Sequence, residues 1–236
     1  QDSAHATISF AILLGSLLGI LALTIKALPQ PNLQLTKKGQ TSGETVVSSY
    51  FSLLKRRKVY LGMGAIFVYV GAEVTIGSLL INYMRREDVL AVEASDASAL
   101  VAIYWGLAML GRFAGVVALK WFSAEKILRL ASAMAIFLVA IAIIFTGPLS
   151  AVALISVGFF NSAHFPLIFS TTLRGSDSST PKISALLCMS ICGGAIITLI
   201  AGSLADIAGL KAAFLVCILC YGYCLYFSNY HRRQQQ

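Results

Sequence analysis

Charged residues and proline are both scarce in this chain. Only 12% of its 236 residues are charged, about half the share in a soluble globular domain, and only 5 are proline. This composition excludes an intrinsically disordered chain, a coiled coil and a collagen-like repeat. The 5 cysteines all lie inside apolar runs, so a disulfide scaffold is excluded as well.

Motifs for enzymatic chemistry are also missing from the sequence. It contains no H-E-x-x-H, no paired acids and no nucleophile–base set at one depth, so we expect no enzyme. Cys217-x-x-Cys220 has no second pair and no nearby histidine, so we expect helix packing there, with no metal and no cofactor. A seven-helix receptor is the remote alternative, because no receptor motif appears and Lys211 lies only at the edge of the last apolar run.

Apolar residues are abundant instead. They make up 58% of the chain, and the mean hydropathy is +0.81, more than a soluble domain of this length can bury. Lipid requires helices, because every backbone group must be hydrogen-bonded internally. We therefore predict an all-α membrane protein with seven spans, at 8–28, 59–83, 99–121, 127–147, 149–173, 183–205 and 210–230.

Basic residues are unequally divided between the two sets of gaps. One set holds 14 of the 18 and the other holds 3, namely Arg85, Arg86 and Lys211, with Arg112 inside a span. Cytoplasmic loops collect Lys and Arg, so the first set and the C-terminus are predicted to be cytoplasmic. The net charge of +8 then reflects topology, and we expect no nucleic-acid partner.

The gaps also suggest how the chain is organised. We expect a last transmembrane helix of a missing N-terminal half at 1–28, and a cytoplasmic central linker at 29–57. A C-terminal six-helix transporter bundle would follow at 58–230, with a cytoplasmic tail at 231–236. Six spans after a central loop are the layout of one half of a major-facilitator transporter. Seven spans put the N-terminus outside, and Gln1 begins no recognisable signal peptide, which suggests a missing upstream part.

Glu73 lies near the middle of the second apolar run. A charge at this depth costs about 2.5–3.5 kcal/mol, so the carboxyl group must face protein or water, be paired, or be protonated. Tyr69 and Gly77 share its helix face, and Gly77 leaves room either for a ligand or for a neighbouring helix. We predict a substrate or ion-coupling role for Glu73, with helix packing as the alternative.

A second polar cluster occupies the fifth apolar run. Asn161 and His164 are three positions apart and share a face, while Pro166 favours a kink or a local opening. An amide and an imidazole are suitable partners for sugar hydroxyls, although a packing role is open for both. The polar centres of the second and fifth runs would hold corresponding positions in two three-span repeats.

The third apolar run carries aromatic and basic residues. Tyr104 and Trp105 are interpreted either as part of an interfacial aromatic belt or as a stacking surface for a sugar ring. Arg112 lies farther along the run, and we predict a structural or gating role for it.

Two pairs of glycines mark places where helices would approach closely. Gly111 and Gly115 give a small-xxx-small pattern around Arg112. Gly193 and Gly194 lie at the centre of the sixth run, where adjacent glycines permit close packing or flexing.

Together these segments resemble the glucose/galactose transporter group of the fucose–galactose–glucose:proton symporter family, within the major facilitator superfamily. The resemblance covers 59–230, and the segments that carry it are YVGAEVTIGS at 69–78, YWGLAMLGRFAG at 104–115, GFFNSAHFPLIFS at 158–170, GGAII at 193–197 and GSLAD at 202–206. His164 departs from the family pattern, in which a hydrophobic residue such as Met is expected.

The resemblance implies a major-facilitator C-terminal six-helix bundle that works by alternating access in a bacterial inner membrane. It implies symport of a hexose, glucose- or galactose-like, with a cation, for which a proton is favoured over sodium. Glu73 and Asn161 fall on motif positions and take a substrate or coupling role by this resemblance. A fucose or polyol permease of the same family is the alternative, although Glu73 in place of glutamine favours the glucose/galactose branch.

Overall fold

Six of the long apolar runs form helices that are long and apolar enough to cross a membrane. The computed structural model describes residues 50–176 and 179–233, all within one compact unit of the chain, and the expected span at 8–28 lies outside the described residues. The elements in chain order are α3 (Arg57–Met84), α4 (Ala94–Ala118), α5 (Ala124–Ile144), α6 (Gly147–Asn161), α7 (His164–Leu173), α8 (Thr180–Met189), the 3-10 helix η2 (Ser190–Cys192), α9 (Gly193–Ala208) and α10 (Leu210–Arg233). The predicted all-α, six-helix architecture is thus confirmed.

The helices extend a few residues beyond the apolar runs. α4 begins at Ala94 where the sequence suggested 99, and its first turn contains Asp96. α5 begins at Ala124 where the sequence suggested 127, and its first turn contains Glu125. Acidic side chains near a helix N-terminus interact favourably with the helix dipole, which explains why the helices include residues that hydropathy alone leaves out.

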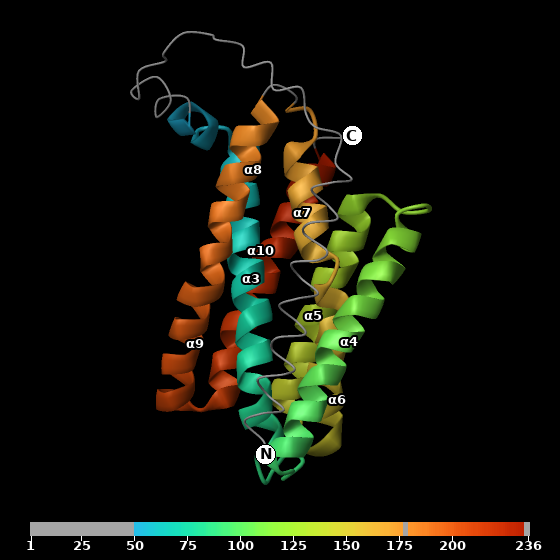
Figure 1. Cartoon of the computed structure of the whole chain (residues 1–236), viewed down its shortest axis with the longest axis vertical. Helices are drawn as coiled ribbons and strands as arrows, with labels where there is room; N and C mark the ends of the chain where they lie inside the picture. The colour runs from blue at the N-terminus through green and yellow to red at the C-terminus, as the bar shows by residue number, and fades with distance from the viewer. Residues whose placement is uncertain (1–49, 177–178, 234–236) are drawn as a thin grey trace, which may run out of the picture. The chain divides into compact units, whose positions relative to one another are not determined.

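Helix α3 is the centre of the bundle. It packs against α9 and α10 on one side and against α4 and α7 on the other, and α8, η2 and α9 follow it along its length (Figure 1). α5 packs between α10 and α6, and α4 packs on α6. Residues from helices far apart in the sequence therefore meet around α3.

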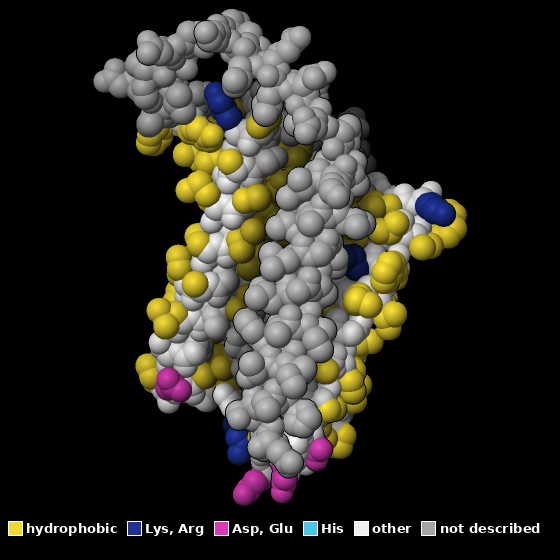
Figure 2. All heavy atoms as spheres, viewed as in Figure 1, with side chains coloured by type: hydrophobic (Ala, Val, Ile, Leu, Met, Phe, Trp, Pro, Cys, Tyr) yellow, Lys and Arg dark blue, Asp and Glu magenta, His cyan; other side chains and the backbone are white. Residues whose placement is uncertain are grey.

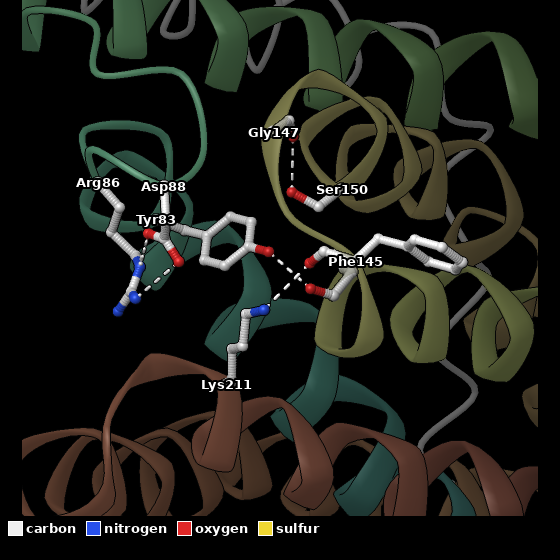
Figure 3. Close-up of polar contacts among 8 residues, drawn as sticks. Tyr83, Arg86, Asp88, Phe145, Gly147, Ser150 and Lys211 are labelled. Carbon is white, nitrogen blue, oxygen red and sulfur yellow. Dashed lines mark hydrogen bonds and ion pairs between the residues drawn. The ribbon is translucent and has the colours of Figure 1, made fainter.

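Three of the connections between helices lie together at the end of the bundle where α3 finishes. Arg86 pairs with Asp88 at 2.7 Å, and the backbone N–H of Gly147 donates to the Asp88 carbonyl at 2.8 Å. The Lys211 ammonium donates to the Phe145 carbonyl at 3.0 Å, so the α3–α4, α5–α6 and α9–α10 connections meet here (Figure 3). The acidic side chains visible in Figure 2 lie toward this end of the bundle.

The opposite end is rich in basic side chains. Arg174, after α7, pairs with Glu125 of α5 at 2.8 Å, and Glu125 is only 3% exposed. Lys58 donates to the Arg174 carbonyl, and the Arg57 guanidinium lies 4.9 Å from the centre of the Tyr230 ring. Basic residues from α3, α5 and the α7–α8 connection therefore gather at one end, as the distribution along the sequence predicted.

The cysteines of α10 take part in helix packing. Cys217 and Cys224 are buried, and their thiols point to the backbone carbonyls of Ala72 and Ala65 at 3.9 Å and 3.8 Å. Both carbonyls belong to α3. The small thiol side chains thus allow α10 to approach the central helix closely.

Candidate functional site

A cavity of about 400 Å³ opens beside the middle of α3. It is lined by residues of α3, α4, α7 and η2, namely Tyr69, Val70, Glu73, Arg112, Phe165, Pro166 and Ile191. Its volume falls within the range typical of small-molecule sites. Four of the residues that the sequence singled out therefore meet at one cavity.

Glu73 and Arg112 supply charges of opposite sign to this cavity. They come from α3 and α4, and they do not form a direct ion pair among the residues that the structure describes. The Tyr69 hydroxyl, one turn before Glu73, interacts with its carboxyl group. The sequence placed Arg112 with the gating residues, but the structure places its side chain in the same cavity as Glu73.

His164 lies behind the cavity wall and is fully buried. Its ring is stacked on that of Tyr69, with centroids 5.0 Å apart and an interplanar angle of 3°. Nδ1 lies 3.1 Å from the Phe160 carbonyl, which can only accept a hydrogen bond, so Nδ1 carries a hydrogen. Nε2 lies 3.0 Å from the Ser132 hydroxyl. His164 therefore contacts the cavity through Tyr69 and does not itself line it.

Asn161 is also fully buried and bridges two tyrosines. Its Nδ2 donates to the Tyr104 hydroxyl at 2.9 Å, and the Tyr221 hydroxyl donates to its Oδ1 at 2.7 Å. The amide therefore joins α6 to α4 and α10, and it does not line the cavity. A ligand contact for Asn161 remains a prediction that requires the bundle to rearrange.

The two aromatic residues of α4 take different positions. Tyr104 is fully buried and bonded to Asn161 in the core, so a role for this ring in an interfacial belt or in sugar stacking remains a prediction. Trp105 is 47% exposed and packs over Gly77, where an added Cβ would lie 3.1 Å from the indole. The space above Gly77 is thus filled by a neighbouring helix.

The glycines lie where helices approach closely. A Cβ on Gly111 would meet the Phe159 carbonyl oxygen, and one on Gly193 would meet the Phe67 carbonyl oxygen. A Cβ on Gly194 would lie 3.1 Å from Val70, whereas Gly115 has ordinary room. The helices approach closely at Gly111, Gly193 and Gly194, where a larger residue would separate them.

Two of the spans are interrupted near the cavity. α6 ends at Asn161 and α7 begins at His164, two residues before Pro166. Proline has no N–H to donate, and its ring clashes with the carbonyl four residues earlier, which here belongs to Ser162. The span at 180–208 is interrupted at η2, directly before Gly193. The sequence predicted the first interruption through Pro166, and the adjacent glycines were the only hint of the second.

Comparison with known proteins identifies the family. The chain is 43% identical over 171 residues to the glucose/galactose transporter of Brucella abortus, covering 72% of this chain and 42% of that protein. It is 35% identical over 222 residues to a putative glucose/galactose transporter of Helicobacter pylori, covering 92% of this chain and 52% of that protein. The crystal structure of FucP, a major facilitator superfamily transporter in the outward conformation, matches 93% of this chain and 53% of its own, with a TM-score of 0.80 and 27% identity. The chain belongs to this family of sugar transporters.

The similarity extends to the L-fucose-proton symporter of Escherichia coli, which is 27% identical over 212 residues, covering 89% of this chain and 48% of that protein. The chain spans about half the length of the curated relatives that it matches. No family model matches the sequence. As a member of the sugar transporter family, the chain is a multi-span membrane protein.

Two residues of the polar network were missed from the sequence. Tyr221 completes the Asn161 bridge, and Ser132 holds the far side of the His164 ring. Both lie inside apolar helices among small or apolar neighbours, where a single hydroxyl gives no distinguishing pattern. Only the packing of α5 and α10 against α6 and α7 shows that they matter.

Proposed function

We propose that this chain forms the C-terminal half of a transporter that imports a hexose by symport with a cation. The observation that carries the proposal is the convergence of a carboxylate, a guanidinium and a phenol on one cavity of about 400 Å³ in an apolar bundle. These groups donate and accept hydrogen bonds in the way that sugar hydroxyls require. Transporters of this architecture bind substrate near the middle of the membrane, beside discontinuous helices.

Glu73 is the residue that we assign to ion coupling. It is the one acidic residue among the described residues that line the cavity, so a proton or a cation taken up there changes the charge that Arg112 and a bound sugar meet. A proton is favoured over sodium, because one relative carries the name L-fucose-proton symporter. The sugar is proposed to be glucose- or galactose-like, since the relatives at 35–43% identity carry that name, and fucose is the second candidate.

The remaining parts of the chain complete this proposal. The basic end of the bundle faces the cytoplasm of a bacterial inner membrane, with the C-terminus on that side. Residues 1–28 supply the last helix of an N-terminal half, and 29–57 supply the central linker, which agrees with the chain's coverage of about half of its relatives. The hexose then binds between two halves, and their rocking exposes it to alternate sides. This chain alone is expected to give no uptake in proteoliposomes, and uptake by it would contradict the two-half arrangement.

The decisive experiment is uptake of labelled glucose, galactose and fucose by the complete transporter that contains this chain. Glu73→Gln is compared with the wild type, with and without proton and sodium gradients. We expect the variant to lose gradient-driven uptake and keep sugar exchange, because it can no longer change charge. Asp206→Asn, which removes an exposed carboxylate at the end of α9, is the matched control and should behave as the wild type. Unchanged coupling in Glu73→Gln would assign Glu73 to packing.

A further inference from the structure

A second, larger cavity lies at the basic end of the bundle, away from Glu73. Its volume is about 700 Å³, and it forms a groove along α4, α5 and α10. α5 and α10 contribute no residue to the lining of the Glu73 cavity. The proposed sugar site at Glu73 therefore does not account for this groove.

Most of the groove wall is apolar and open. Phe122 is 56% exposed and Leu130 is 62% exposed. Ala133 also lines the groove, and its small side chain takes up little of the space beside α10. Leu130 lies on the membrane-spanning helix α5, where an exposed apolar side chain would face acyl chains, and Phe122 lies in the α4–α5 connection beside it. The groove is therefore shaped and lined to accept a hydrocarbon chain.

Two cations stand at the mouth of this apolar groove. Lys126 and Arg129 lie three residues apart in the first turns of α5, so they share one face. Neither forms an ion pair in the part of the chain that the structure describes. The carboxylate of the adjacent Glu125 is buried and bound to Arg174. The amide of Asn229 adds a further hydrogen-bonding group from α10.

We propose that this groove binds one anionic phospholipid, with its phosphate against Lys126 and Arg129 and an acyl chain along Phe122, Leu130 and Ala133. The charges are complementary, and basic pockets between helices at the cytoplasmic side of a membrane are suited to such headgroups. A second copy of this chain is a poor occupant, because a symmetric contact would bring the same two cations against each other. Each cation near a membrane surface contributes about fivefold to the affinity for an anionic lipid.

The test is native mass spectrometry of the full chain in detergent, titrated with phosphatidylglycerol or with phosphatidylcholine of the same acyl chains. We expect the wild type to retain phosphatidylglycerol preferentially, and Lys126→Gln/Arg129→Gln, which loses two such contributions, to retain roughly 25-fold less. Lys55→Gln/Arg56→Gln removes the same charge from exposed positions outside the groove and should retain lipid as the wild type does. An equal loss in both double variants would overturn the proposal, since general surface charge would then explain the binding.

A second variant tests the groove without changing any charge. Ala133→Trp fills the place where the acyl chain would lie, and its exposed position leaves the core unaltered. We expect it to lower phosphatidylglycerol retention severalfold while the thermal unfolding midpoint in detergent stays the same. Unchanged retention would overturn the assignment, as would a dimer that disappears with either groove variant, because the occupant would then be a second copy of the chain.

Discussion

The imidazole ring of His164 lies parallel to the phenol ring of Tyr69, with an interplanar angle of 3°. Tyr69 lines the cavity and interacts with Glu73, whereas His164 is buried and tied to Ser132 and Phe160. His164, which lies outside the cavity, thus packs against the ring of Tyr69, which lines the cavity. We interpret His164 as a positioning residue for the Tyr69 hydroxyl.

Replacing His164 should weaken sugar binding without unfolding the bundle. His164→Met nearly conserves volume but removes the partner of the Ser132 hydroxyl and the Phe160 carbonyl, so we expect a loss of stability of about 1–3 kcal/mol. The lost ring stacking is worth about 0.5–1.5 kcal/mol, which predicts an apparent KM raised roughly twofold to tenfold. Uptake by the complete transporter, measured against sugar concentration, separates KM from the maximal rate.

Tyr69→Phe is the matched variant, because it keeps the ring and removes only the hydroxyl. We expect it to raise KM as His164→Met does, and the double variant to be no worse than either single one. A KM that rises in Tyr69→Phe and stays unchanged in His164→Met would show that the stacking does not position the hydroxyl.

Asn161 should matter first for stability. Asn161→Leu leaves the buried hydroxyls of Tyr104 and Tyr221 without their partner, which we expect to cost about 1–3 kcal/mol. The triple variant with Tyr104→Phe and Tyr221→Phe should recover much of this loss, because no polar group is then stranded. Thermal unfolding in detergent measures both, and wild-type stability in Asn161→Leu would argue against the bridge.

The two glycines around Arg112 should respond differently to the same substitution. Gly111→Ala puts a Cβ against the Phe159 carbonyl oxygen and 2.6 Å from the Ser162 hydroxyl, so we expect a loss of roughly 1–3 kcal/mol. Gly115→Ala places its Cβ 3.6 Å from that of Ala163, an ordinary contact, and should be neutral or stabilising by up to about 1 kcal/mol. Equal unfolding midpoints for the two variants would contradict the close approach of α4 to α6.

The two ion pairs of the described bundle should also differ in how much each contributes to the free energy of unfolding. Arg174→Gln removes the ion pair to the Glu125 carboxylate, which is 3% exposed, and should cost about 2 kcal/mol, since a hydrogen bond to a charged group is lost. Arg86→Gln breaks an exposed pair and should change the unfolding midpoint little. Denaturation of both variants in the same detergent compares them, and the reverse order would contradict the burial of Glu125.

The Arg86–Asp88 pair carries a definite pH dependence. The hydrogen bond from Arg86 lowers the pKa of Asp88 below its ordinary value, so the pair contributes stability above about pH 4. This contribution is lost as the pH falls through the lowered pKa of the folded state. The difference in unfolding midpoint between wild type and Asp88→Asn should be constant from about pH 5 to 8 and vanish in stronger acid. If the difference in unfolding midpoint instead grew in acid, the pKa of Asp88 would be raised by folding and not lowered.

The sequence by itself determined the six described helices, the basic and acidic ends, and the polar positions inside the membrane. These features are local, because lipid forces each long apolar run into a helix and makes a charged group, an amide or an imidazole inside such a run conspicuous. Gly111 and Gly193 were equally visible, since only small residues allow such close helix contact.

Only the tertiary structure decided which of those polar groups meet. It joined Asn161 to Tyr104 and Tyr221, stacked His164 on Tyr69, and brought Arg112 into the cavity of Glu73. These partners lie on different helices, and their meeting depends on how each helix is rotated about its axis when it packs around α3. The rotation of each helix is fixed by its contacts with segments distant in the sequence, so it cannot be predicted from the hydropathy of a single run.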